Sequence, residues 1–99
     1  MVTTTIGNRK QATALATSIV EARLAACVQQ GAIQSVYRWK GKMDSGKEIL
    51  LSCKTRAALA PALLKFIRAQ HPYELPEIIV TPITDGLPAY LAWIRKETR

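Results

Sequence analysis

The sequence predicts an α+β fold, a ferredoxin-like βαββαβ sandwich followed by one more helix. A chain of 99 residues has room for one domain, so residues 1–99 are expected to form a single unit. Apolar residues make up 48% and charged residues 21%, as in ordinary globular proteins. The hydrophobic period alternates between two and 3.6 residues in the order β-α-β-β-α-β-α. The first six elements match a four-stranded antiparallel sheet with two helices on one face.

The first half of the chain predicts a strand, a helix and the start of a hairpin. Val2 to Thr5 is β-branched, which favours a strand. Asn8 is a good N-cap for a helix whose apolar residues recur at helical spacing up to about Ala25 or Ala26. Residues 33–39 alternate with the period of a strand, and the polar, glycine-bearing segment 40–47 is expected to be a turn.

The second half predicts two more strands and two more helices. Glu48 to Lys54 completes the hairpin. Thr55 is expected to cap the following helix, which Pro72 ends. Residues 77–81 form a further strand and residues 85–96 a closing helix. Because both earlier helices cover the same face, the other face of the sheet is open to oligomerisation or to a ligand.

The net charge of +7 admits two interpretations. A basic surface attracts nucleic acid, but the basic residues are spread along the chain, as on a solvated surface. RNA-recognition domains share the βαββαβ plan and stack bases on aromatic residues of the third strand. The corresponding strand here, Glu48 to Lys54, has no aromatic residue. Nucleic acid is therefore a disfavoured partner.

The two cysteines, Cys27 and Cys53, are far apart and lie in apolar contexts, so we expect small buried side chains without a disulfide. The N-terminus lacks a signal pattern, and no apolar run approaches the roughly 18 residues of a membrane span. We expect a cytoplasmic protein with no membrane partner.

The segment His71-Pro72-Tyr73-Glu74-Leu75-Pro76-Glu77 concentrates the chemistry of the chain. It holds the only histidine, a phenol and two carboxylates, and imidazole and carboxylate are ligands of divalent metals. The alternative is structural: a helix end with His71 placed favourably at the C-terminus. Lys54, at the end of a strand, would reach the rim of the sheet or pair with Glu74 or Glu77.

Trp39 and Trp93 would line a ligand pocket or belong to the core or an interface. The sequence shows no recognisable nucleophile motif, although a Cys–His pair is conceivable, and no glycine-rich phosphate loop. It therefore predicts that the protein is not an enzyme.

Seven segments, in this order, support a family resemblance: Leu15–Ala16, Val20–Val28, Ser35–Gly41, Glu48–Leu51, Lys54–Thr55, His71–Ile78 and Tyr90–Ile94. They cover nearly the whole chain, and with them it resembles the CutA family of divalent-cation-tolerance proteins. The resemblance implies a tight homotrimer, similar in architecture to the PII signalling proteins, and a link to tolerance of copper and other divalent metals without an established reaction.

The resemblance also implies a binding cleft between protomers. The matching positions are Lys54, His71, Tyr73 and Glu74, with Trp39 and Trp93 as walls. It makes His71 and Glu74 the metal ligands, for Cu²⁺ or another divalent cation, with Tyr73 as a hydrogen-bond donor and Lys54 as a charge partner.

The chain departs from the family pattern at several positions. Some members are credited with copper ligation by a first-strand cysteine beside a His-His pair, whereas here those positions hold Thr4 and Gln70. One imidazole alone does not make that copper site. Gln29 stands where the family commonly has an asparagine. The Pro-Gly pair that is usual in the family is reduced here to Gly31.

The sequence therefore predicts a non-catalytic trimeric protein of divalent-metal tolerance that binds metal or a small ligand at an inter-protomer cleft. Two alternatives stay open. One is a module for a small metabolite or anion, with Lys54 and the tryptophans dominant, and the other is a trimeric scaffold for a partner protein.

Overall fold

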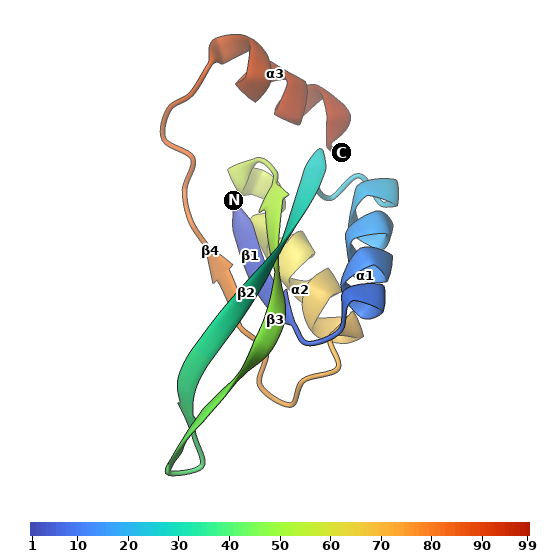
Figure 1. Cartoon of the computed structure of the whole chain (residues 1–99). Coiled ribbons are helices and arrows are strands. Elements are labelled where there is room, and N and C mark those ends of the chain that lie inside the picture. The colour runs from blue at the N-terminus through green and yellow to red at the C-terminus, as the bar shows by residue number, and fades with distance from the viewer.

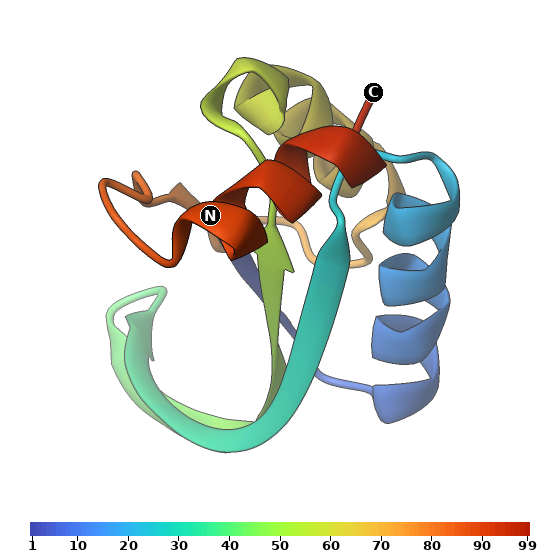
Figure 2. The same ribbon diagram turned by 90° about the horizontal axis from the view of Figure 1, so that it is seen from above.

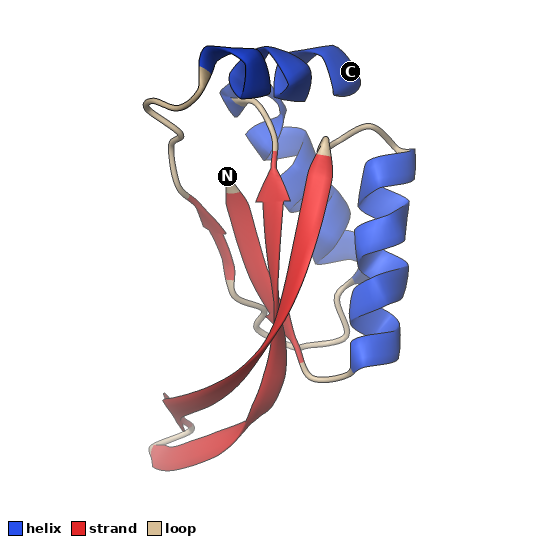
Figure 3. Cartoon of the chain, turned by 45° about the horizontal axis from the view of Figure 1, so that its top comes forward, coloured by secondary structure: helices blue, strands red, loops and turns tan.

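The computed structural model describes residues 1–99, which form four strands, three α-helices and one 3-10 turn. The elements are β1 (Val2–Ile6), α1 (Arg9–Glu21), β2 (Cys27–Trp39), β3 (Lys42–Lys54), η1 (Ala57–Leu59), α2 (Ala60–Gln70), β4 (Ile78–Val80) and α3 (Pro88–Glu97). The strands form one antiparallel sheet in the order β2-β3-β1-β4. Helices α1 and α2 cover one face, and α3 crosses one end of the sheet (Figures 1 and 3). This confirms the ferredoxin-like plan with an additional C-terminal helix.

The core lies between the sheet and the two helices. Alternation along β1 and β3 turns Ile6, Leu51 and Cys53 toward the helices, where they are buried. Leu63 and Ile67 of α2 pack against them. Each such side chain contributes roughly 1.5–3 kcal/mol by leaving water. The other face of the sheet carries no helix along most of its length, as the sequence predicts.

Helix α1 ends earlier than its apolar pattern suggests. The side chain of Asn8 accepts a hydrogen bond of 3.0 Å from the amide of Gln11, which confirms the predicted N-cap. The helix ends at Glu21 instead of near residue 25, because Arg23 adopts a left-handed conformation with φ 58°. Its amide and that of Leu24 bond back to the carbonyls of Val20 and Ile19, at 3.0 and 3.1 Å. These bonds form a Schellman motif with arginine at the position that glycine usually fills, which the sequence therefore does not signal.

Strands β2 and β3 form a hairpin that is much longer than the rest of the sheet. Both strands have 13 residues, but β1 pairs with β3 only from Ile49 to Cys53. Residues 34–47 therefore project beyond the sheet as a two-stranded arm, which curves strongly when seen from above (Figures 1 and 2). We call these residues the arm.

The predicted turn over residues 40–47 is wrong in length. Only Lys40 and Gly41 make the turn, with φ of 51° and 78°. Two positive φ values are required by the tight hairpin turn whose twist matches that of the flanking strands. Gly46 lies inside β3, opposite Ser35.

The start of the second helix also differs from the prediction. Arg56 is the N-cap of η1 and makes no side-chain capping bond, while the Oγ1 atom of Thr55 is buried without a hydrogen-bond partner in the protein. Thr55 is therefore not the cap, because the helical segment begins one residue too late for its hydroxyl. The predicted end is confirmed: α2 stops at Gln70, before Pro72.

The last strand and helix are slightly shorter than predicted. Strand β4 covers only residues 78–80, and α3 begins at Pro88. Asp85 does not enter the helix because its carboxylate accepts a bond of 2.8 Å from the amide of Gly86, which holds a turn there.

The two cysteines are free, as predicted, but only Cys53 is buried, whereas Cys27 is partly exposed. Cys27 lies opposite Lys54 and Cys53 lies opposite Val28, so the two side chains point to different faces of the sheet. Burial raises the pKa of the Cys53 thiol to about 12, which keeps it protonated. No helix of the chain combines the length and the apolar character needed to cross a membrane.

Candidate functional site

A groove of about 730 Å³ opens beside the base of the arm. One side comes from β2 and β3, and the other from the loop between α2 and β4. Its aromatic and charged lining residues are three aromatic side chains, three carboxylates and one lysine: Tyr37, Trp39, Tyr73, Glu48, Glu74, Glu77 and Lys47. A space of this size is typical of small-molecule sites, and its carboxylates favour a cationic ligand.

A hydrogen bond joins the two sides of the groove. The phenol of Tyr73 donates to Oε2 of Glu48 over 2.9 Å. Burial pushes the pKa of Glu48 upward, but hydrogen bonds from the hydroxyls of Ser35, Tyr73 and Thr5 outweigh it and leave the pKa below its ordinary value. Burial, together with the bond to Glu48 and its negative charge, raises the pKa of Tyr73 to about 12. At neutral pH the pair is therefore a neutral phenol and an ionised carboxylate.

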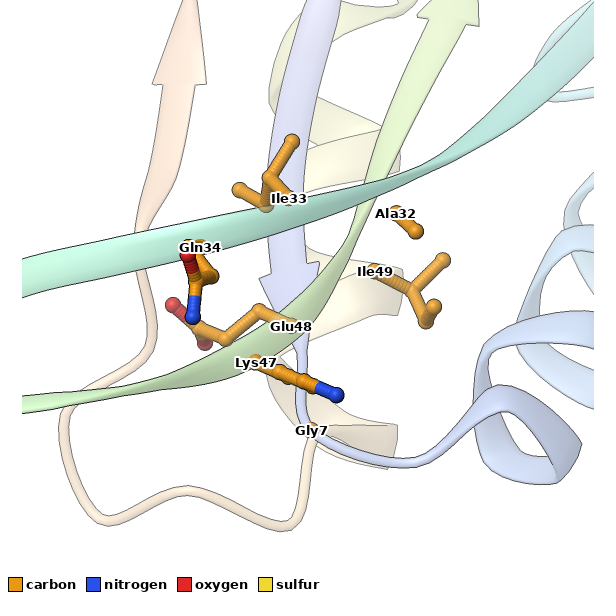
Figure 4. Close-up of a pocket in the computed structure, with 7 residues that line it drawn as sticks. All are labelled: Gly7, Ala32, Ile33, Gln34, Lys47, Glu48 and Ile49. Carbon is orange, nitrogen blue, oxygen red and sulfur yellow. The ribbon is translucent and has the colours of Figure 1, made fainter.

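Gly7 leaves room for this pair. A Cβ atom at Gly7 would stand 2.9 Å from the hydroxyl oxygen of Tyr73, which is closer than carbon and oxygen normally approach. Gly7 also lines a second hollow of about 420 Å³, on the other side of β3 (Figure 4). In that view Lys47 and Glu48, which are neighbours on β3, point to opposite sides of the strand. Gln34, Lys47 and Glu48 line both hollows.

His71 holds the loop in place. Its Nδ1 accepts a hydrogen bond of 3.1 Å from the amide of Tyr73, so the proton sits on Nε2, which donates to the carbonyl oxygen of Thr5 over 2.8 Å. The His71 and Tyr73 rings meet edge to face with centroids 4.7 Å apart. Both ring nitrogens are therefore engaged with backbone groups, and a metal would reach Nδ1 only after the amide of Tyr73 is released.

The structure brings together only part of the predicted site. Trp39, Tyr73 and Glu74 line the same groove, and His71 lies next to it through Thr5. Lys54 is at the other end of the segment of β3 that pairs with β1, where its Nζ lies 3.5 Å from the sulfur of Met1. The chain therefore does not bring Lys54 to Glu74 or Glu77.

Trp93 is likewise distant from the groove within one chain. It lies on α3, where its ring packs against that of Tyr90 with centroids 5.4 Å apart. Both rings remain partly exposed, at 40% and 42%.

A single chain does not contain a metal centre. No group of three or more His, Cys, Asp or Glu side chains is placed to hold an ion. Thr4 of β1 shares the helix-covered face of the sheet with Leu51. The carboxylates of the groove lie on the other side of β1, with Thr5. The residues of one chain alone thus do not fit a divalent-metal site.

Two residues of the site were missed from sequence. Glu48 is 25 positions away from Tyr73, and Gly7 lies in a different connection altogether. One signal was present: Glu48 precedes the apolar alternation of Ile49, Leu51 and Cys53, which places its carboxylate on the open face of the sheet.

The comparisons with known proteins agree with the fold. The family described as CutA1 divalent ion tolerance protein matches residues 1–97. Protein CutA of Mus musculus is 45% identical over 95 residues, which are 95% of this chain and 54% of that protein. The divalent-cation tolerance protein CutA of Thermus thermophilus is 40% identical to this chain. The matched region covers 95% of this chain and 92% of that protein. The chain spans about half the length of the first curated relatives that it matches.

Solved structures give the same assignment. The crystal structure of CutA1 from Oryza sativa superposes with a TM-score of 0.94 at 42% identity, over 99% of this chain and 91% of that one. The Cut A1 divalent cation tolerance protein of Thermus thermophilus gives 0.94 at 39% identity, over 99% and 96%. This α+β chain, with an open sheet face and an acidic groove, therefore shares its fold with proteins described as divalent cation tolerance proteins. It belongs to the CutA1 family.

Proposed function

We propose that the protein acts in divalent-cation tolerance as a non-catalytic homotrimer that binds a metal ion or small ligand in a cleft between protomers. The observation that supports this most is the groove itself, which combines three carboxylates with three aromatic rings yet lacks a complete ligand set within one chain. A second protomer would supply the missing side. We place this activity in the cytoplasm.

The arm supports an assembly of several chains. Val36 and Met43, on one of its faces, are 72% and 71% exposed. Tyr37 and Trp39 are half-exposed on its other face. Beyond Ile49 the edge of β3 that faces β1 has no partner strand within the chain, and β2 is an edge strand along its whole length. Exposed apolar side chains and free strand edges are features that partner chains cover.

Within this cleft Glu74 and His71 are the proposed metal ligands, with Cu²⁺ or another divalent cation as cargo. Glu74 is exposed on the groove and needs no rearrangement. His71 has to give up the amide of Tyr73 to present Nδ1. Metal binding at His71 would therefore be coupled to movement of the loop.

Calorimetric titration with Cu²⁺ tests this assignment. Wild type, His71→Ala and Glu74→Gln are compared, with Glu21→Gln on the exposed face of α1 as a control that makes the same charge change elsewhere. We expect clear weakening in the first two variants and wild-type affinity in the control. Equal affinity in wild type and His71→Ala would remove His71 from the site.

A second candidate ligand is a small metabolite. It is favoured by the aromatic walls from Tyr37, Trp39 and Tyr73 and by a volume within the range of small-molecule sites. Native mass spectrometry of the protein purified from its host discriminates between the two, because a retained organic mass favours the metabolite and a retained metal mass favours the ion.

A further inference from the structure

A third hollow, of about 290 Å³, lies at the end of the sheet that α3 crosses, far from the acidic groove. It is lined by the start of the η1–α2 helical segment on one side and by α3 on the other, which lie close together in Figures 1 and 3. It shares no lining residue with the groove. Nothing in the proposed metal function uses it.

Two polar atoms at this hollow are buried without a partner. Thr55 is only 4% exposed, and its Oγ1 makes no hydrogen bond in the protein. The neighbouring Nε of Arg56 is also buried and has no partner. Thr55 and Arg56 both line the hollow. A buried polar atom that lacks a partner is costly, so two adjacent ones at one hollow indicate a ligand that satisfies them.

The charges around the hollow specify an anion. Arg56 and Arg95 are its charged side chains, and no Asp or Glu lines it. Two guanidinium groups with no carboxylate side chain beside them favour a negatively charged ligand. Arg56 is held there because its Nη2 donates to the main-chain oxygen of Arg99.

We propose that this hollow binds a phosphate group through the Thr55 hydroxyl, the Arg56 Nε and the Arg95 guanidinium. The group is either free phosphate or the monoester of a small organic molecule, since Ile83 and Leu91 give the hollow an apolar wall beside its basic end. An arginine matches the tetrahedral oxygens of phosphate with directed donors. Within one chain this site is separate from the acidic groove.

The test is isothermal titration calorimetry of the intact protein with inorganic phosphate at constant ionic strength in chloride. Thr55→Val keeps the shape of the side chain and removes only its hydroxyl. Because that hydroxyl has no partner in the protein, the variant should unfold at the same temperature as wild type or higher in phosphate-free buffer. We expect its affinity for phosphate to fall about tenfold or more, whereas Thr55→Ser keeps wild-type affinity.

Arg95→Gln on α3 should also weaken binding, by about tenfold. Arg9→Gln removes the same charge from the exposed start of α1 and should leave the affinity unchanged. The proposal is overturned if wild type binds neither inorganic phosphate nor phenyl phosphate, if Thr55→Val binds as tightly as wild type, or if Arg9→Gln weakens binding as much as Arg95→Gln.

Phenyl phosphate distinguishes the two sources of the phosphate group. Tighter binding of phenyl phosphate than of inorganic phosphate identifies a monoester whose organic part contacts the apolar wall. Equal or weaker binding identifies free phosphate as the ligand. Either result supports the site, and the Cu²⁺ titration of the groove variants is unaffected by both.

Discussion

The phenol of Tyr73 donates a 2.9 Å hydrogen bond to the carboxylate of Glu48, and so ties the loop after α2 to the base of the arm. Tyr73 belongs to the proline-framed loop, whereas Glu48 is the last residue of β3 before the strand joins β1. The bond therefore fixes the width of the acidic groove. Because both side chains can gain or lose a proton, the contribution of this bond to stability can be measured as a function of pH.

Replacing Tyr73 by phenylalanine should change the alkaline stability of the protein. The pKa of Tyr73 is raised from 10.0 to about 12 in the folded state, so the folded protein holds the phenol proton more tightly than the unfolded chain. This contribution is fully present below pH 10 and is lost as the pH rises toward 12. Urea unfolding should show wild type more stable than Tyr73→Phe by about 1 kcal/mol at neutral pH, with the difference shrinking above pH 10. Parallel pH profiles would contradict the assigned bond.

Replacing Glu48 by glutamine tests how the ionised carboxylate contributes to stability at acidic pH. The pKa of Glu48 is lowered from 4.5 in the folded state, so its contribution to stability is present above that pH and is lost as the pH falls below it. Wild type should lose its advantage over Glu48→Gln as urea unfolding is repeated at successively lower pH. In a double-mutant cycle with Tyr73→Phe the coupling energy should also disappear in acid. A coupling energy of zero at neutral pH would show that the two side chains do not interact in solution.

Gly7→Ala should reproduce the effect of losing the Tyr73 hydroxyl. The added Cβ would stand 2.9 Å from that oxygen, and the end of the tyrosine side chain has to move away. Above pH 10, we expect the unfolding free energy of Gly7→Ala to lack the decline that loss of the Tyr73–Glu48 bond causes in wild type. Adding Tyr73→Phe to Gly7→Ala should change the stability little further. Gly31→Ala is the control, because a Cβ there meets nothing within 4 Å and should alter stability by less than about 0.5 kcal/mol. If both alanine variants keep the wild-type alkaline profile, Gly7 does not constrain the pair.

Sequence patterns predicted the order of the elements because helix and strand periods are local. Asn8 signalled the first helix, and the alternation of Leu51 and Cys53 identified the buried face. The length of the arm was not predictable, since residues 42–47 are polar apart from Met43 and contain Gly46, and no core within the chain imposes an apolar pattern on them. The early end of α1 was hidden because arginine, and not glycine, occupies the left-handed position.

The site was predictable only where its residues are close in sequence. His71, Tyr73 and Glu74 fall in one motif, but their partners come from other elements. Glu48 and Thr5 reach the loop through sheet register, which a single sequence does not specify. Pairing of Lys54 with Glu74 or Glu77 was expected from its place at a strand end, and the resemblance grouped it with the loop as well. Within one chain it lies beyond the far end of the paired segment of β3. Its place in the proposed cleft depends on the assembly.

Charged substitutions on the arm test that assembly directly. Val36→Glu combined with Met43→Glu places two charges on one exposed face of the arm, away from the core. Leu64→Glu, on the surface of α2 and 38% exposed, is the matched control. If the arm mediates association, the first variant should dissociate while keeping its circular dichroism spectrum, and the control should remain assembled.

The most direct test of the shared cleft is the mass of the wild-type protein by sedimentation velocity, run beside these two variants. We expect a single species of three times the chain mass for wild type and for Leu64→Glu, and a folded monomer for the arm variant. A stable wild-type monomer over the whole concentration range would contradict it, because the acidic groove would then have no second protomer to complete it.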